Sequence, residues 1–276
     1  MDLRHLVALG GLACTATSPT LAGQFHMAGG AFFSEADTSI GVTNPNTGND
    51  FDLDFESDLS LKERSTLPYL LVGYDFNERH GIFLDWRSLH RKASNTVVTK
   101  PFQLPDSNTE VQAGARLDST LNIDILRFGY NYKFYDGEDW DWKASIGLHI
   151  MNFNVGFGGE LGYRVDQDDP TLIPVKDEEF TDLTAPLPNI GLITDYRITD
   201  NWHLLGHAQV FALSIEEISG LLLDLGAGIE YKFTEDFGLA ATYSYYEINV
   251  DYGRDFADLD AKFKFYSPMA TLTYAF

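Results

Sequence analysis

Acidic and basic side chains alternate with apolar residues along many short stretches of the 276-residue chain. In an extended segment, residues two apart share a face, so each stretch separates a charged face from an apolar one. Charges from several segments that face one interior would pair with one another, or would line a path for solutes. The side chains that this alternation places on the charged face are Asp75, Asp85, Arg87, Arg127, Lys133, Lys143, Asp195, Arg197, Asp224, Glu230 and Lys232.

Three histidines, His149, His203 and His207, are expected on the same face. Neighbouring imidazoles suggest a metal site or a general base, but no cysteine or carboxylate is fixed as their partner by its spacing. The signatures of membrane-embedded proteases, phospholipases and lipid A deacylases are not recognisable. The sequence therefore leaves enzymatic activity open but favours its absence, and it identifies no catalytic residue.

A run of alternating acids that begins at Asp50 resembles the opening of a calcium-binding loop. Phe55 stands where such a loop needs glycine, and Leu61 stands where it needs the closing glutamate, so an EF-hand is excluded. Asp50, Asp52 and Asp54 would still share one face of an extended segment and offer a weak site for Ca²⁺ or Mg²⁺. Solvated loop charge is the simpler interpretation, and no other cofactor is expected.

Five segments share one pattern, and this pattern determines which residues lie on the charged face and which lie on the apolar face. Each is about nine residues long, alternates in polarity and ends on an aromatic residue, and this is the length of a β-strand that crosses a bilayer. The first four run into short polar turns, and a partner strand follows each turn. The five segments are 68–76, 126–134, 188–196, 225–233 and 268–276.

With an opening strand at 24–33, the pattern predicts an all-β, antiparallel transmembrane β-barrel of about ten strands, within a range of eight to twelve. The expected topology is a meander with short periplasmic turns and longer acidic external loops. Rows of aromatic residues at one depth are typical of membrane interfaces. A soluble β-sandwich would not account for this pattern together with the unequal lengths of the connections.

The N-terminus, residues 1–22, is expected to be a secretory signal peptide, because a basic start precedes an apolar run and small residues. The single cysteine, Cys14, falls within it, so the mature domain, residues 23–276, would contain no disulfide.

The formal net charge of −22 and the lack of a basic patch exclude nucleic acid as a natural partner.

Ile123 and Ile125 fall on the face of Arg127 rather than on that of Phe128. Either a bulge changes the phase of this strand, or apolar side chains point inward. Together with an inward Phe211, the second arrangement would form an apolar pocket near the outer mouth and permit uptake or binding of a hydrophobic molecule. The competing interpretation is that the strand has left the bilayer and packs beneath an external loop.

The chain ends on a strand that places Tyr274 and the terminal Phe276 on one face. This ending resembles the signal that the outer-membrane barrel assembly machinery of Gram-negative bacteria recognises. With its alternating strands, the whole mature chain resembles the small, uncharacterised outer-membrane β-barrel proteins of these bacteria. The resemblance implies an integral protein of the cell outer membrane that contacts lipid and lipopolysaccharide and meets the assembly machinery during insertion.

The expected function is a structural or surface-interaction role, in a barrel whose lumen is plugged by ion pairs. Two alternatives remain open: a porin-like barrel in which water separates the charges, and a barrel that binds or takes up a small hydrophobic molecule. A membrane-embedded hydrolase is the minor alternative.

Overall fold

The computed structural model describes residues 23–43, 50–98, 101–103, 109–111, 113–159, 162–164, 171–173, 178–215, 218–254 and 257–276. The predicted signal peptide, residues 1–22, lies outside them. Among the described residues, no helix is long and apolar enough to cross a membrane. The strands of the described residues are β1 (Gln24–Thr43), β2 (Asp50–Asp54), β3 (Arg64–Asp75), β4 (His80–Val97), β5 (Phe102–Gln103), β6 (Thr109–Val111), β7 (Arg116–Asp136), β8 (Trp140–Gly159), β9 (Gly162–Arg164), β10 (Thr171–Ile173), β11 (Glu178–Arg197), β12 (Trp202–Ile215), β13 (Ile218–Lys232), β14 (Phe237–Arg254) and β15 (Ala257–Ala275).

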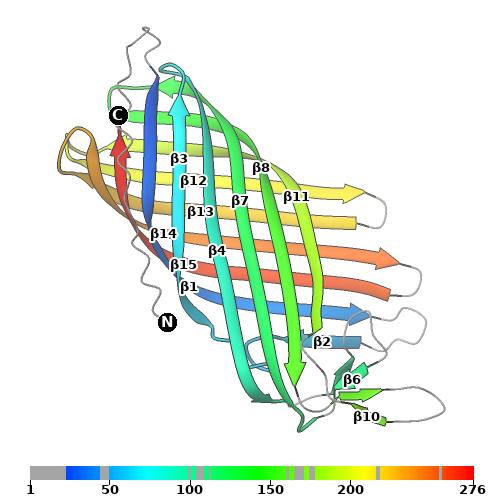
Figure 1. Cartoon of the computed structure of the whole chain (residues 1–276). Helices are drawn as coiled ribbons and strands as arrows, with labels where there is room; N and C mark the ends of the chain where they lie inside the picture. The colour runs from blue at the N-terminus through cyan, green and yellow to red at the C-terminus, as the bar shows by residue number, and fades with distance from the viewer. Residues whose placement is uncertain are drawn as a thin grey trace, which may run out of the picture.

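Ten of the described strands close into an antiparallel barrel (Figure 1). The order around the wall is β1, β3, β4, β7, β8, β11, β12, β13, β14 and β15, and β15 returns to pair with β1. The predicted fold, a meander barrel of about ten strands, is confirmed. The ring is closed where all neighbouring strands pair, as an apolar medium requires, but β3 pairs with β4 only over residues 69–75 and β11 pairs with β12 only over residues 190–197.

The two ends of the barrel differ. At one end, here named the short-turn end, β3 joins β4, β7 joins β8, β11 joins β12 and β13 joins β14 through connections of three or four residues. The paired ends of β1 and β15 lie at this end too, where the Phe25 amide donates to the Phe276 carbonyl at 2.8 Å. The opposite, long-loop end carries β2 and a small sheet in the order β10, β9, β6 and β5 (Figure 1).

Several strands are longer than a bilayer needs. β7 spans 21 residues and β8 spans 20, whereas about 9–11 residues of a tilted strand cross the hydrocarbon core. Toward the short-turn end, outward positions are apolar and open to the surroundings, as at Ile146, Ile190 and Leu272, which are 61%, 62% and 52% exposed.

Outward positions become polar toward the long-loop end. Three cross-strand pairs lie on this outer surface: Glu35 with Arg64 at 3.2 Å, His90 with Asp124 at 3.0 Å and Glu247 with Lys264 at 3.6 Å. The wall therefore changes from a surface that suits lipid to one that suits water.

The interior changes in the opposite sense. Toward the long-loop end, its inward side chains form an apolar cluster, whose members include Phe32, Leu67, Leu89, Ile123, Ile125, Met151, Leu222, Ile248, Phe263 and Phe265. The segment 53–61, here named the mouth segment, covers this cluster and buries Leu53, Phe55, Leu59 and Leu61. The ring of Phe55 lies 6.5 Å from that of Phe157 on β8. This half of the barrel is packed like the core of a water-soluble protein.

Candidate functional site

A group of four charged side chains crosses the lumen just below the apolar cluster. Arg127 donates from Nε to Asp85 Oδ2 at 2.6 Å and also bonds that oxygen through Nη2, while its Nη1 reaches Asp224 Oδ2 at 2.5 Å. Arg87 Nη2 lies 3.5 Å from the same oxygen of Asp224. The four side chains, here named the charge layer, are each 7% exposed or less.

The strand arrangement explains how the charge layer forms. Asp85 on β4 and Arg127 on β7 are direct cross-strand partners, so their bond runs along the wall. Asp224 lies on β13, which is no neighbour of β7, so the second bond of Arg127 crosses the lumen. Two guanidinium groups and two carboxylates neutralise one another, which offsets the cost of burying each charge.

Further side chains extend this group around the wall. Gln209 Oε1 accepts from Arg127 Nη1 at 3.3 Å and from Asn189 Nδ2 at 2.9 Å. His207 Nε2 lies 3.0 Å from Asp224 Oδ1. The Arg87 guanidinium lies 5.7 Å from the centre of the Tyr69 ring. The lumen is thus bridged at this level by hydrogen bonds between side chains.

The remaining charges of the predicted set lie near the short-turn end. Asp75 is 3.7 Å from Lys143 and 2.9 Å from His26 Nε2. Lys133 lies 3.1 Å from Asp141. These pairs belong to the rim of the barrel, separate from the charge layer.

Three further members of the predicted set occupy different places. Glu230 accepts a hydrogen bond from the Thr273 hydroxyl, and Lys232 follows on the same face of β13. Arg197, the register partner of His203, is the last residue of β11 and lies at the short-turn end. It is 44% exposed and bonds Asp139 at 3.1 Å, because β11 ends there beside the turn between β7 and β8.

The histidines are not gathered in one place. His203 Nδ1 lies 2.8 Å from Asp195 Oδ1 at the rim, whereas His207 bonds Asp224. His149 has no exposed surface, and neither ring nitrogen has a hydrogen-bond partner among the described residues. Each of these His–Asp contacts joins two neighbouring strands. They could not be predicted from the sequence, because it does not give the register in which the strands pair.

The predicted apolar pocket is a packed core. The pairing of β7 with β8 runs without a register shift from Leu117 to Lys133, so Ile123 and Ile125 point inward without a bulge. Both have no exposed surface, and Phe211 packs against the same cluster. The open pocket predicted near the outer mouth is therefore wrong at these residues. Ile123 and Ile125 instead belong to the same buried cluster as the mouth segment.

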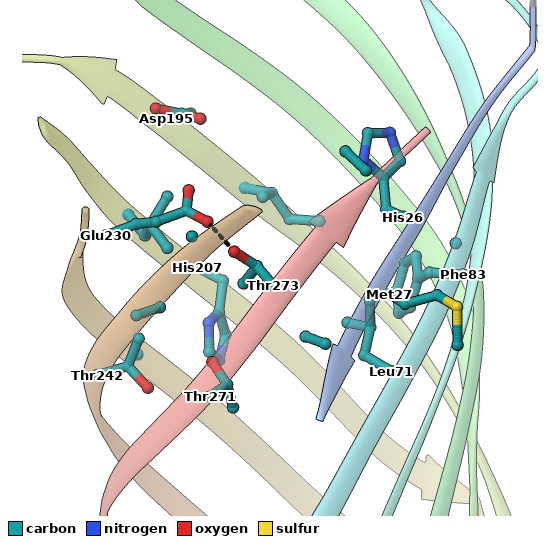
Figure 2. A pocket seen from close by; sticks show the side chains of 18 of the residues that line it. His26, Met27, Leu71, Phe83, Asp195, His207, Glu230, Thr242, Thr271 and Thr273 are labelled. Atoms are coloured by element: carbon teal, nitrogen blue, oxygen red, sulfur yellow. Dashed lines mark hydrogen bonds between the residues drawn. The ribbon is translucent and has the colours of Figure 1, made fainter. Parts of the chain in front are cut away.

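A cavity of about 490 Å³ lies on the other side of the charge layer and opens at the short-turn end (Figure 2). Arg87, Arg127 and Gln209 form its closed end. Small and apolar side chains form its walls, and Asp195 and Glu230 lie among the polar groups of its rim. Ile123, Ile125 and Phe211 do not line it.

Comparison with known proteins identifies the fold. No protein-family model and no curated protein matches the sequence. The outer membrane protease OmpT from Escherichia coli superposes with a TM-score of 0.57 at 12% identity, over 95% of this chain and 99% of that one. The fold is that of a Gram-negative outer-membrane β-barrel. At this identity, the likeness extends to the fold alone.

Two other outer-membrane proteins match more loosely. The attachment invasion locus protein Ail of Yersinia pestis gives a TM-score of 0.35 at 12% identity, over 92% of this chain and 99% of that one. The toluene transporter TbuX of Ralstonia pickettii gives 0.38 at 11% identity, over 91% of this chain and 88% of that one.

The acidic stretch of this outer-membrane barrel is a strand edge followed by a turn. Asp50 and Asp52 belong to β2, which pairs with the end of β1, and their side chains lie outside those that the structure describes. Asp54 Oδ1 accepts the Ser57 amide at 2.7 Å and so caps the turn. Cation binding at these residues stays a prediction.

Proposed function

We propose that the protein is an integral outer-membrane β-barrel with a closed lumen, and that its role is structural or lies in contacts of its surface. The contacts of Arg127 with Asp85 on one side and Asp224 across the lumen carry this proposal. A second barrier supports it, because the apolar cluster and the mouth segment fill the interior beyond the charge layer. An ion would have to break both barriers in series.

The orientation follows from the two ends. Short turns are typical of the periplasmic side, so the mouth segment and the small sheet would face the exterior. The apolar outward band would contact lipid, and the polar pairs beyond it would meet lipopolysaccharide head groups and water. Residues 1–22 would direct export, and the acidic Asp50 stretch would lie outside the cell.

The last strand supports recognition by the barrel assembly machinery. The Tyr274 ring stacks on Phe237 at 4.4 Å and on Phe276 at 5.1 Å, and Phe276 stacks on Phe25 at 5.3 Å. These rings form part of an aromatic row at the short-turn end, where the seam between β15 and β1 closes. Such rows anchor a barrel at the interface between bilayer and water.

Single-channel recording tests the closed lumen. Residues 23–276 would be refolded, with heat-modifiable gel migration as the check for a formed barrel, and inserted into a planar bilayer. We expect no discrete conductance from the wild type, from Arg127→Gln or from the matched control Arg197→Gln, because the apolar cluster still blocks the lumen. Stable wild-type steps whose ion selectivity changes in Arg127→Gln, with Arg197→Gln unaltered, would instead establish a porin.

A further inference from the structure

The cavity below the charge layer has the size and chemistry of a small-molecule site. Its volume of about 490 Å³ falls within the roughly 300–1,000 Å³ of ligand pockets. Leu71, Ile193 and Leu205 contribute apolar side chains to its walls. The His207 ring packs directly against Gly226, where a Cβ atom would lie 2.2 Å from it. The cavity is a blind apolar chamber that opens at one end.

The closed end of this chamber offers no free charge. Arg87 and Arg127 reach it, but both are held by Asp85 and Asp224 in the charge layer. An anionic ligand would have to compete with these two carboxylates for the guanidinium groups. The chamber therefore does not select anions at its closed end.

Glu230 supplies the unbalanced charge. Its side chain lines the chamber and is 8% exposed, and its one hydrogen bond among the described residues comes from the uncharged Thr273 hydroxyl (Figure 2). No lysine or arginine of the described residues forms an ion pair with it. A carboxylate that is buried with one neutral donor is costly unless a cation compensates for it.

The rest of the rim adds negative charge. Asp195, which also lines the chamber, is 41% exposed and has His203 as its partner. Six acidic side chains and two lysines line the chamber at its rim. Asp75 pairs with Lys143, and Asp141 pairs with Lys133, which lies at the rim as well. Four acids then remain against Lys232, and this excess would attract cations from the surrounding water. The acids are Asp75, Asp141, Asp195, Glu230, Glu235 and Asp236, and the lysines are Lys143 and Lys232.

We propose that this chamber binds a small organic cation with an apolar body, which enters from the short-turn end. The ammonium group would pair with Glu230, with Asp195 as the second carboxylate at the rim. The apolar body would lie against Leu71, Ile193 and Leu205, beneath the charge layer. This binding function is distinct from the closed lumen, because the chamber ends below both barriers.

Calorimetry with matched eight-carbon probes tests the proposal. The refolded barrel in lipid nanodiscs would be titrated with n-octylammonium, octanoate and octanol, with empty nanodiscs as the blank. We expect one octylammonium per barrel, bound at least about tenfold more tightly than octanoate, since one ion pair of about 1.4 kcal/mol gives that ratio. Glu230→Gln should reduce the affinity for octylammonium to that for octanol, and the control Glu78→Gln, in an exposed turn that does not line the chamber, should leave it unchanged.

A second variant separates the chamber from adsorption to lipid. Ala240→Leu places a larger side chain in the wall and should weaken the binding of all three probes, with heat-modifiable migration confirming a folded barrel. Equal affinities for octylammonium and octanoate, or an unchanged affinity in Glu230→Gln, would overturn the proposal. Neither result would contradict the proposal of a closed lumen. Conductance by the wild type would contradict the closed lumen but not the proposed cation site.

Discussion

Ile125 and Arg127 are two residues apart on the inward face of β7, yet Ile125 is sealed in the apolar cluster while Arg127 binds Asp85 and Asp224. The outward face changes at the same level, from the exposed Phe128 to Asp124, which bonds His90. Both faces of one strand thus exchange their polarity within a few residues. The simplest physical cause is that the hydrocarbon of the bilayer ends here, so that the strand continues into water.

Cysteine accessibility would locate this boundary. The predicted mature chain lacks cysteine, so Asp124→Cys and Phe128→Cys would each provide a single thiol on the same outward face of β7. We expect a membrane-impermeant maleimide to label Asp124→Cys rapidly in liposomes and to label Phe128→Cys after unfolding. Equal labelling of the two folded variants would show that the bilayer does not end between these positions.

Removal of Arg127 should destabilise the barrel strongly. In Arg127→Met, Asp85 loses its closest partner and Asp224 keeps Arg87 and His207, so an excess negative charge is left buried. We expect a loss of about 3–5 kcal/mol in the free energy of unfolding, measured by urea titration in lipid vesicles.

Two further variants control for this prediction. Arg197→Met removes an exposed ion pair and should cost at most about 1 kcal/mol. Adding Asp85→Asn to Arg127→Met restores the charge balance, with Arg87 and Asp224 left as a pair, and should recover part of the stability. A cost for Arg127→Met no larger than that for Arg197→Met would mean that the charge layer does not hold the barrel together.

The alternation of residues along the strands predicted much of the fold but little of the candidate functional site. It placed Asp85, Arg127 and Asp224 on one face, because a period of two residues fixes the facing of a side chain wherever the strand is regular. It could not pair Arg127 with Asp224, since a contact across the lumen depends on barrel diameter and strand stagger. For the same reason, the cavity and the cation site at Glu230 have no sequence signal.

The position at which each strand leaves the bilayer could not be predicted from the sequence either. The inward Ile123 and Ile125 allowed a bulge, a pocket or a strand in water, because alternation has the same period inside and outside the membrane. Arg197 has the parity of Asp195, but parity alone did not show that it ends β11 beside a turn, where it is 44% exposed and bonds Asp139. Register and strand ends therefore had to come from the structure.

Close approach of β1 and β15 should make Gly30 sensitive to substitution. A Cβ atom on Gly30 would lie 2.0 Å from the Ala270 carbonyl oxygen, whereas one on Gly29 would meet nothing within 4 Å. Gly30→Ala should therefore force the closing seam apart and cost about 1–3 kcal/mol, as overpacking does, while Gly29→Ala should be nearly neutral. Equal urea midpoints for the two variants would contradict this account of the seam.

Glu56 fastens the mouth segment to two strands of the barrel. Its Oε1 accepts from Arg91 Nη1 on β4, and its Oε2 accepts the Thr38 amide of β1 at 2.8 Å. Arg91 Nη2 also donates to the Thr38 hydroxyl at 2.6 Å. Burial raises the pKa of the Glu56 carboxyl above its usual value of 4.5, while the charge of Arg91 acts in the opposite direction.

The raised pKa of Glu56 makes the stability that this residue contributes depend on pH. The folded barrel binds the proton of Glu56 more tightly than the unfolded chain does, so this contribution is complete below pH 4.5 and is lost as the pH rises through the folded pKa. We expect the unfolding free energy of the wild type, relative to Glu56→Gln, to fall as the pH is raised from 4 to about 7 in urea titrations. The exposed Glu63→Gln should track the wild type at every pH. A difference between wild type and Glu56→Gln that stays constant or rises over this range would mean that Arg91, rather than burial, sets the pKa of Glu56.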